Sequence, residues 1–185
     1  MRKGKLTDGL LALALMFAVG IGLGCGKRNG PSVKATVENS IQQAGVQDIS
    51  VAEDRDKKVI TLKGNVPDEA QKSQAEQAAT AAAPGWVVAN EIGVRPAGAE
   101  GDAKSISSNI DDAIEKNYKA ALVANNLENA GIHFGARNGV LTLDGKVATP
   151  QQREEAQKLA ATVPNVGQVV NKLEVKNQPA TMSHK

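Results

Sequence analysis

The sequence predicts an α+β fold built from two tandem modules, each with the order helix, strand, strand, helix, strand. The first observation is repetition: segment 59–66 matches 140–147, and 88–94 matches 169–175, both at an offset of 81 residues. The second is alternation of apolar and polar residues within these segments, and the third is helical spacing of apolar residues between them. A fixed repeat indicates a duplicated unit, and the two periods indicate strands and helices.

The second copy begins with a predicted amphipathic helix. Apolar residues recur at helical spacing along a polar segment, and we expect Gly131 to end the helix. These apolar residues are Ile110, Ile114, Leu122 and Leu127.

A strand pair follows this helix. Residues 132–136 alternate in polarity, as the half-buried strand of a sheet does. Asn138 and Gly139 form the dipeptide preferred in type I′ turns, which join antiparallel strands. The sequence therefore predicts a hairpin that leads into a second strand at 140–147.

Pro150 opens the second helix of this copy, since proline is favoured in the first turn. One apolar stripe runs along it through Ala156, Leu159, Ala160 and Val163. Segment 166–176 is predicted as the last strand.

The first copy repeats the order, with helices at 33–43 and 68–82 and strands at 48–54, 58–66 and 86–95. Each copy buries its apolar stripes most simply as a small three-stranded mixed sheet with both helices on one face.

The repeat also sets the predicted domain limits. The first module is expected at 32–95 and the second at 106–176. Residues 96–105, rich in Pro, Gly and Ala, have the composition of a linker. The tail 177–185 is predicted to be disordered.

The N-terminus is predicted to be a lipoprotein-type signal peptide at 1–24, with basic residues followed by an apolar run that ends at Cys25. The Leu-Gly-Cys ending resembles the lipobox of bacterial lipoproteins, although Gly22 and Leu23 stand where that motif usually has Leu and a small residue. The resemblance implies lipidation of Cys25 and a lipidated tether at 25–31.

Composition limits the classes of function. Removal of residues 1–24 would leave equal numbers of basic and acidic side chains, which argues against a nucleic-acid partner. The single Cys allows no intrachain disulfide. The two histidines lie far apart in the sequence, and His133 is expected on the open face of a strand. We therefore expect no metal site, no cofactor and no catalytic residues.

The repeated motif resembles the BON domain family, named for osmotically induced and nodulation proteins of bacteria. The motif residues in the second copy are Val140, Leu141, Leu143, Gly145 and Val147, with counterparts in the first copy. The Ala-rich helix, the Pro-containing turn and the Val-x-Asn-x-Leu/Ile-x-Val strand also match.

This resemblance implies a non-catalytic envelope lipoprotein whose modules bind a phospholipid surface or envelope components, in support of envelope integrity under osmotic stress. It implies a periplasmic location with a lipid anchor in the outer membrane. Anchoring in the inner membrane and a soluble periplasmic form remain open. The alternative function is a chaperone-like or adaptor protein that binds other proteins, which an exposed apolar patch on the open sheet face would favour.

Four residues are candidates for contact with a membrane. By resemblance to a two-BON lipoprotein that meets anionic phospholipid through its second module, these include Lys116, Tyr118 and Lys119, although acidic neighbours offset their charges. Trp86 is the fourth, because exposed Trp favours the membrane interface. Packing in the core is the alternative for Trp86.

Asn90 and Asn171 lie at equivalent positions of the two last strands, on the same side as the apolar residues. A buried Asn needs hydrogen-bond partners, and we expect backbone groups of a neighbouring turn to supply them. Contact with a ligand is the alternative for both asparagines.

Overall fold

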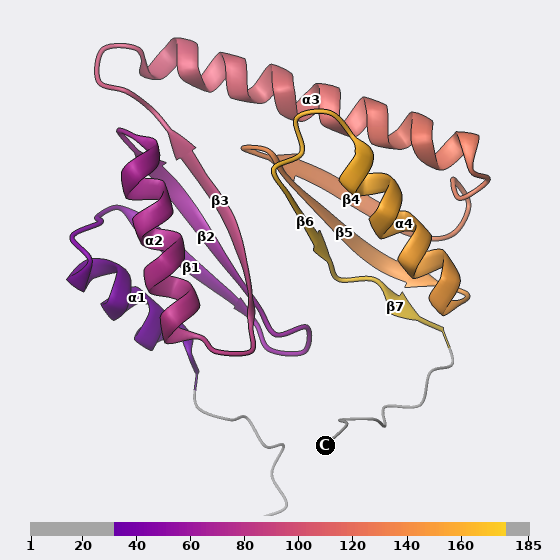
Figure 1. The fold of residues 1–185 in the computed structure, drawn as a ribbon, viewed down its shortest axis with the longest axis horizontal. Helices are drawn as coiled ribbons and strands as arrows, with labels where there is room; N and C mark the ends of the chain where they lie inside the picture. The colour runs from indigo at the N-terminus through magenta and orange to yellow at the C-terminus, as the bar shows by residue number, and fades with distance from the viewer. Residues whose placement is uncertain (1–31, 177–185) are drawn as a thin grey trace, which may run out of the picture. The chain divides into compact units, whose positions relative to one another are not determined.

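The computed structural model describes residues 32–176. The predicted signal peptide, Cys25 with its tether, and the tail 177–185 lie outside the described residues. Within 32–176, the chain folds as two αββαβ modules, which confirms the predicted fold class (Figure 1).

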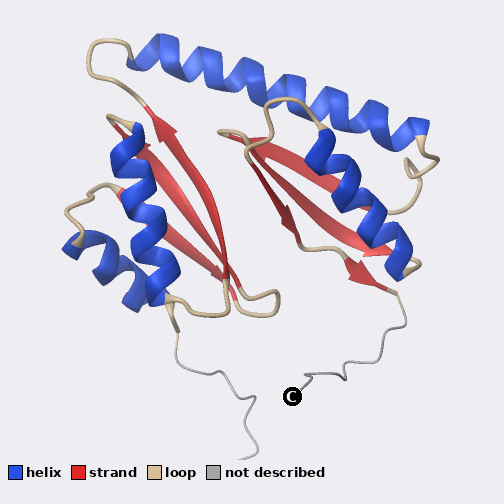
Figure 2. Cartoon of the chain, viewed as in Figure 1, coloured by secondary structure: helices blue, strands red, loops and turns tan. Residues whose placement is uncertain are grey.

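The first module consists of α1 (Lys34–Gln43), β1 (Ile49–Asp54), β2 (Val59–Val66), α2 (Glu69–Ala82) and β3 (Val87–Val94). The strands form a mixed sheet in the order β1-β2-β3. The first pair is antiparallel and the second is parallel. The two helices cover one face of this sheet (Figure 2).

The second module consists of α3 (Glu100–Ala124), β4 (Ile132–Arg137), β5 (Val140–Val147), α4 (Pro150–Thr162), β6 (Gln168–Asn171) and β7 (Glu174–Val175). The strand order β4-β5-β6 and the pairing directions repeat those of the first module. Helix α4 covers one face of this sheet (Figure 2), and buried residues of α3 share the core between α4 and the sheet.

Each module has its own apolar core between helices and sheet. In the first, Ile60, Leu62 and Val66 of β2 pack with Ala75 and Ala79 of α2. The corresponding residues of the second module, at an offset of 81, are Leu141, Leu143, Val147, Ala156 and Ala160. Small alanines on the second helix allow it to approach the sheet closely.

The second helices also begin alike. The Asp68 carboxylate accepts a hydrogen bond from the Gln71 N–H at 2.8 Å, and the Thr149 hydroxyl accepts one from the Gln152 N–H at 3.2 Å. Both residues therefore cap free N–H groups of a helix N-terminus.

The first helix of the second module differs from the prediction at both ends. It begins at Glu100, so the second half of the predicted linker 96–105 is helical. It ends at Ala124 rather than near Gly131, because Asn126 takes a left-handed φ of 56° and the Leu127 N–H turns back to the Leu122 carbonyl.

The hairpin agrees with the prediction, whereas the last strand does not. Asn138 and Gly139 have φ values of 48° and 80°, as a type I′ turn requires. The predicted strand 166–176 is instead two short strands, β6 and β7, with Lys172 and Leu173 between them. The Asn171 side-chain oxygen accepts the Leu173 N–H at this break.

Candidate functional site

Asn90 is buried and joins β3 to the second helix of its module. Its amide nitrogen donates to the Lys72 carbonyl at 3.3 Å and to a Glu76 carboxylate oxygen at 2.9 Å. Its side-chain oxygen accepts from the Ile92 N–H at 3.4 Å. The expectation of backbone partners is confirmed, although the carbonyl partner belongs to a helix rather than a turn.

Asn171 repeats this arrangement in the second module. Its amide nitrogen donates to the Arg153 carbonyl at 3.4 Å and to the Gln157 side chain at 2.9 Å, and its oxygen accepts from the Leu173 N–H at 3.0 Å. Every partner stands 81 residues after its counterpart, so this asparagine is a repeated structural element of the module.

We expect Asn90→Ala to lower the free energy of unfolding of the first module by about 2 kcal/mol, since buried polar groups lose their partners. Asn171→Ala should cost less, because Asn171 is half-buried and water can replace its hydrogen bonds. Urea denaturation followed by fluorescence of Trp86, the only Trp, measures the first variant. Equal costs measured by circular dichroism for the two variants would contradict this ranking.

Tyr118 is fully buried in the second module. Its hydroxyl donates to the Ala156 carbonyl at 3.1 Å, and its ring meets Phe134 edge to face at a centroid distance of 4.9 Å. The side chain therefore joins α3 to α4 and β4 as part of the core. This placement corrects the expectation that Tyr118 contacts a membrane.

Lys116 and Lys119 are exposed on α3, whereas two acidic neighbours face inward. The Asp111 carboxylate accepts the N–H groups of Asn138 and Gly139 at 2.8 and 2.9 Å. Glu115 likewise accepts a backbone N–H of β4 at 2.8 Å. These two carboxylates hold the hairpin, whereas Asp112, the third acidic neighbour, is exposed one helical turn before Lys116.

Trp86 is half-buried, directly precedes β3 and packs against the core of the first module. It therefore belongs to a different module from the two lysines.

The described residues belong to one compact unit, and the contact between the modules is the feature that sequence reasoning missed. Val59, Ala89, Val140 and Val170 form a third buried apolar cluster, with two residues from each module. They lie on the sheet faces that the helices leave open. The sequence did contain a signal for this contact. Val59 and Val140 are equivalent positions, as are Ala89 and Val170, and each is an apolar residue on an open sheet face.

Gln168 of β6 supplies two hydrogen bonds to the free edge of β3. Its amide nitrogen donates to the Val88 carbonyl at 2.7 Å, and its oxygen accepts from the Asn90 N–H at 3.1 Å. One side chain thereby satisfies backbone groups that an edge strand otherwise leaves unpaired.

Ion pairs also cross between the modules. Asp54 lies 3.2 Å from the Lys172 ammonium, and Lys57 pairs with Glu174. Burial opposes ionisation of Asp54, but the Lys57 N–H and the Lys172 ammonium outweigh it and hold the pKa of this carboxyl below its usual value.

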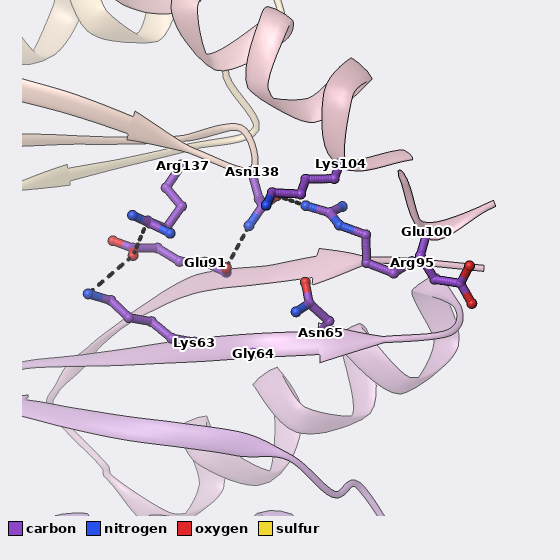
Figure 3. A pocket seen from close by; sticks show the side chains of 9 residues that line it. All are labelled: Lys63, Gly64, Asn65, Glu91, Arg95, Glu100, Lys104, Arg137 and Asn138. Carbon is purple, nitrogen blue, oxygen red and sulfur yellow. Dashed lines mark hydrogen bonds and ion pairs between the residues drawn. The ribbon is translucent and has the colours of Figure 1, made fainter. Parts of the chain in front are cut away.

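A groove of about 460 Å³, hereafter the inter-module groove, lies beside this contact (Figure 3). Four cationic and two acidic side chains line it, together with two asparagines and one glycine. These residues are Lys63, Arg95, Lys104, Arg137, Glu91, Glu100, Asn65, Asn138 and Gly64.

Arg95 is the most firmly held cation of the groove. Its guanidinium donates to the Val94 carbonyl at 2.8 Å, the Ser107 hydroxyl at 3.2 Å and the Asn138 side-chain oxygen at 3.3 Å. It folds over Gly93, where a Cβ atom would lie 3.0 Å from the guanidinium carbon. Gly93 therefore provides the space that this guanidinium occupies.

Residues 32–176 contain no group of three or more His, Cys, Asp and Glu side chains placed to hold a metal ion. In the same residues, no helix combines the length and the apolar character needed to cross a membrane. His133 is exposed on the open face of β4, as predicted.

The fold is a tandem pair of αββαβ modules with separate cores and a shared polar groove. A family model of the BON domain matches residues 31–96 and 110–177, and the chain belongs to the BON domain family.

The chain is also similar to a curated relative and to solved structures. The chain is 25% identical to osmotically-inducible protein Y of Escherichia coli (strain K12) over 202 residues, which cover 95% of this chain and 99% of that protein. Two structures of CdsD, a structural protein of the Type III secretion system of Chlamydia trachomatis, are each 14% identical with a TM-score of 0.30. The first match covers 75% of this chain and 90% of the CdsD chain, and the second covers 80% and 98%.

Proposed function

We propose that this BON protein is a non-catalytic component of the cell envelope that binds an anionic phospholipid surface and supports osmotic stress tolerance. The osmotic role is supported by the end-to-end similarity to osmotically-inducible protein Y. We further propose a periplasmic location, with Cys25 as the point of lipid attachment to the outer membrane.

The exposed face of α3 is the observation that carries the lipid proposal. Lys116, Lys119 and Val123 share this face, because Val123 follows the two lysines by seven and four residues. Val123 is 52% exposed, although it is a large apolar side chain. Asp111 and Glu115 are turned inward, whereas Asp112 is exposed one helical turn before Lys116, so the face offers two cations and one carboxylate beside an apolar contact. The net positive charge and the exposed Val123 suit a surface of anionic headgroups and acyl chains.

We expect segment 31–185, a compact unit that lacks Cys25, to cosediment with anionic vesicles at low salt. Lys116→Gln with Lys119→Gln should weaken binding roughly 30-fold, since each cation near an anionic surface contributes about 1 kcal/mol. The matched control is Arg153→Gln with Lys158→Gln, the same charge change on α4. Failure of the unaltered segment to cosediment, or an equal loss in the control, would overturn the lipid proposal.

The alternative is an adaptor that binds other proteins, and the open sheet faces offer little support for it. Their apolar residues Val59, Ala89, Val140 and Val170 are buried in the contact between the modules. Val87, 49% exposed, is the one large exposed apolar side chain among the described strands. Vesicle binding lost in the α3 variant, but kept in the control, would decide for the lipid surface.

A further inference from the structure

The inter-module groove has more positive than negative charge, and part of its negative charge is already neutralised. The Glu91 carboxylate lies 3.7 Å from the Lys63 ammonium and 3.5 Å from the Arg137 guanidinium, with only 12% of its side chain exposed. One carboxylate is thus shared by a cation from each module. Together, Glu91, Lys63 and Arg137 keep a net positive charge at the wall of the groove.

Glu100, the other carboxylate, is engaged at the N-terminus of α3. It accepts the Gly98 N–H at 3.0 Å, and its own backbone N–H together with that of Gly98 lowers the pKa of its carboxyl. The backbone of the helix terminus therefore compensates the charge of Glu100.

Two of the cations keep donors for a ligand. A guanidinium has five N–H donors, and three contacts with the protein leave about two of those of Arg95 without a partner in residues 32–176. Lys104 is exposed and forms no ion pair within the described residues. Figure 3 shows its side chain extending from α3 toward Asn138.

We propose that the inter-module groove is a binding site for a phosphate group, with Arg95 and Lys104 as its principal donors and Lys63 and Arg137 as flanking cations. A rigid guanidinium beside a mobile ammonium suits phosphate, which has several oxygens and carries one or two negative charges. The volume of about 460 Å³ accommodates a phosphate with a small organic substituent. The site is distinct from the membrane-facing surface of α3 and does not depend on the proposed lipid docking.

The site also connects the modules. Lys63 belongs to the first module, Arg95 follows its last strand, and Lys104 and Arg137 belong to the second module. A phosphate held by these groups contacts both modules, so we expect it to stabilise their contact.

The test is titration of segment 31–185 with inorganic phosphate, followed by backbone and arginine side-chain NMR at constant ionic strength set with chloride. We expect saturable shifts at Gly93, Arg95 and Asn138. Lys104→Gln should weaken phosphate binding about tenfold or more, through the loss of one charge-assisted hydrogen bond. Because Lys104 is exposed and unpaired among the described residues, this variant should fold normally. Lys158→Gln, an exposed lysine of α4, is the control.

Two competition experiments identify the molecule that carries the phosphate group. Displacement of inorganic phosphate by glycerol phosphate, but not by vesicles that contain phosphatidic acid, would support a soluble ligand. Displacement by the vesicles would support a lipid headgroup. Shifts that chloride alone reproduces, or that Lys104→Gln leaves unchanged, would overturn the proposal. The Lys116 and Lys119 variant should bind inorganic phosphate normally, which separates this result from the vesicle experiment.

Discussion

Gly145→Ala is expected to destabilise the second module by about 3 kcal/mol or more. Gly145 has a φ of +116°, a conformation that residues with a side chain rarely adopt. A Cβ atom there would lie 2.2 Å from the Gly131 carbonyl oxygen, so the backbone of the paired strand would have to move. The strain and the clash add, and a module of this size has only a few kcal/mol of stability.

The measurement is urea denaturation followed by circular dichroism. Gly101→Ala is the matched control, because Gly101 lies in the first turn of α3 with no atom within 4 Å of the added Cβ position. The control should be neutral or stabilising, since alanine favours helix. A free energy of unfolding for Gly145→Ala within 1 kcal/mol of the original protein would show that the close approach is not needed.

Tyr118→Ala is expected to cost about 3 to 5 kcal/mol, because it removes a fully buried aromatic side chain and leaves a cavity. Tyr118→Phe keeps the ring and its contact with Phe134 and loses only the hydrogen bond to Ala156, so about 1 kcal/mol is expected. Denaturant midpoints of the two variants give the comparison. A mild effect of Tyr118→Ala would restore the side chain as a candidate for surface contact.

Stability at high pH offers a second measurement on the same residue. Burial raises the pKa of the Tyr118 hydroxyl above its ordinary value of 10.0, because the charged phenolate loses hydration in the core. The unfolded chain then releases this proton at a lower pH than the folded chain. The stabilising contribution is therefore full below pH 10 and declines as the pH rises above it. Tyr118 is the only Tyr, so ultraviolet absorbance of tyrosinate reports on it alone.

The repeat explains why so much of the fold was predictable. Each module is specified by local patterns: alternation in β2 and β5, an apolar stripe in α2 and α4, and a turn dipeptide at Asn138-Gly139. The motif glycines follow the same logic, because Gly64 and Gly145 both have positive φ and both approach a carbonyl of the preceding strand segment. Because the module is duplicated, most of these patterns occur twice in the sequence and are easier to recognise.

The errors arose where contacts distant in sequence compete with local preference. Residues 100–105 resemble a linker in composition, but Arg95 at the end of β3 bonds Ser107 and so ties the start of α3 to the first module. Tyr118 lies among lysines in the sequence, yet its position on the helix faces Ala156 and Phe134. Its neighbours in space, and not its neighbours in sequence, determine its burial.

The candidate site, like the fold, was only partly predictable from the sequence. By itself, the sequence determined two modules of one family, with their elements and cores, because periodicity and turn chemistry act over a few residues. Only the tertiary structure decided which open-face residues meet, that Gln168 closes the edge of β3, and that Arg95, Lys104, Lys63 and Arg137 line one groove. Their positions along the chain span more than 70 residues, and packing of one module against the other brings them together.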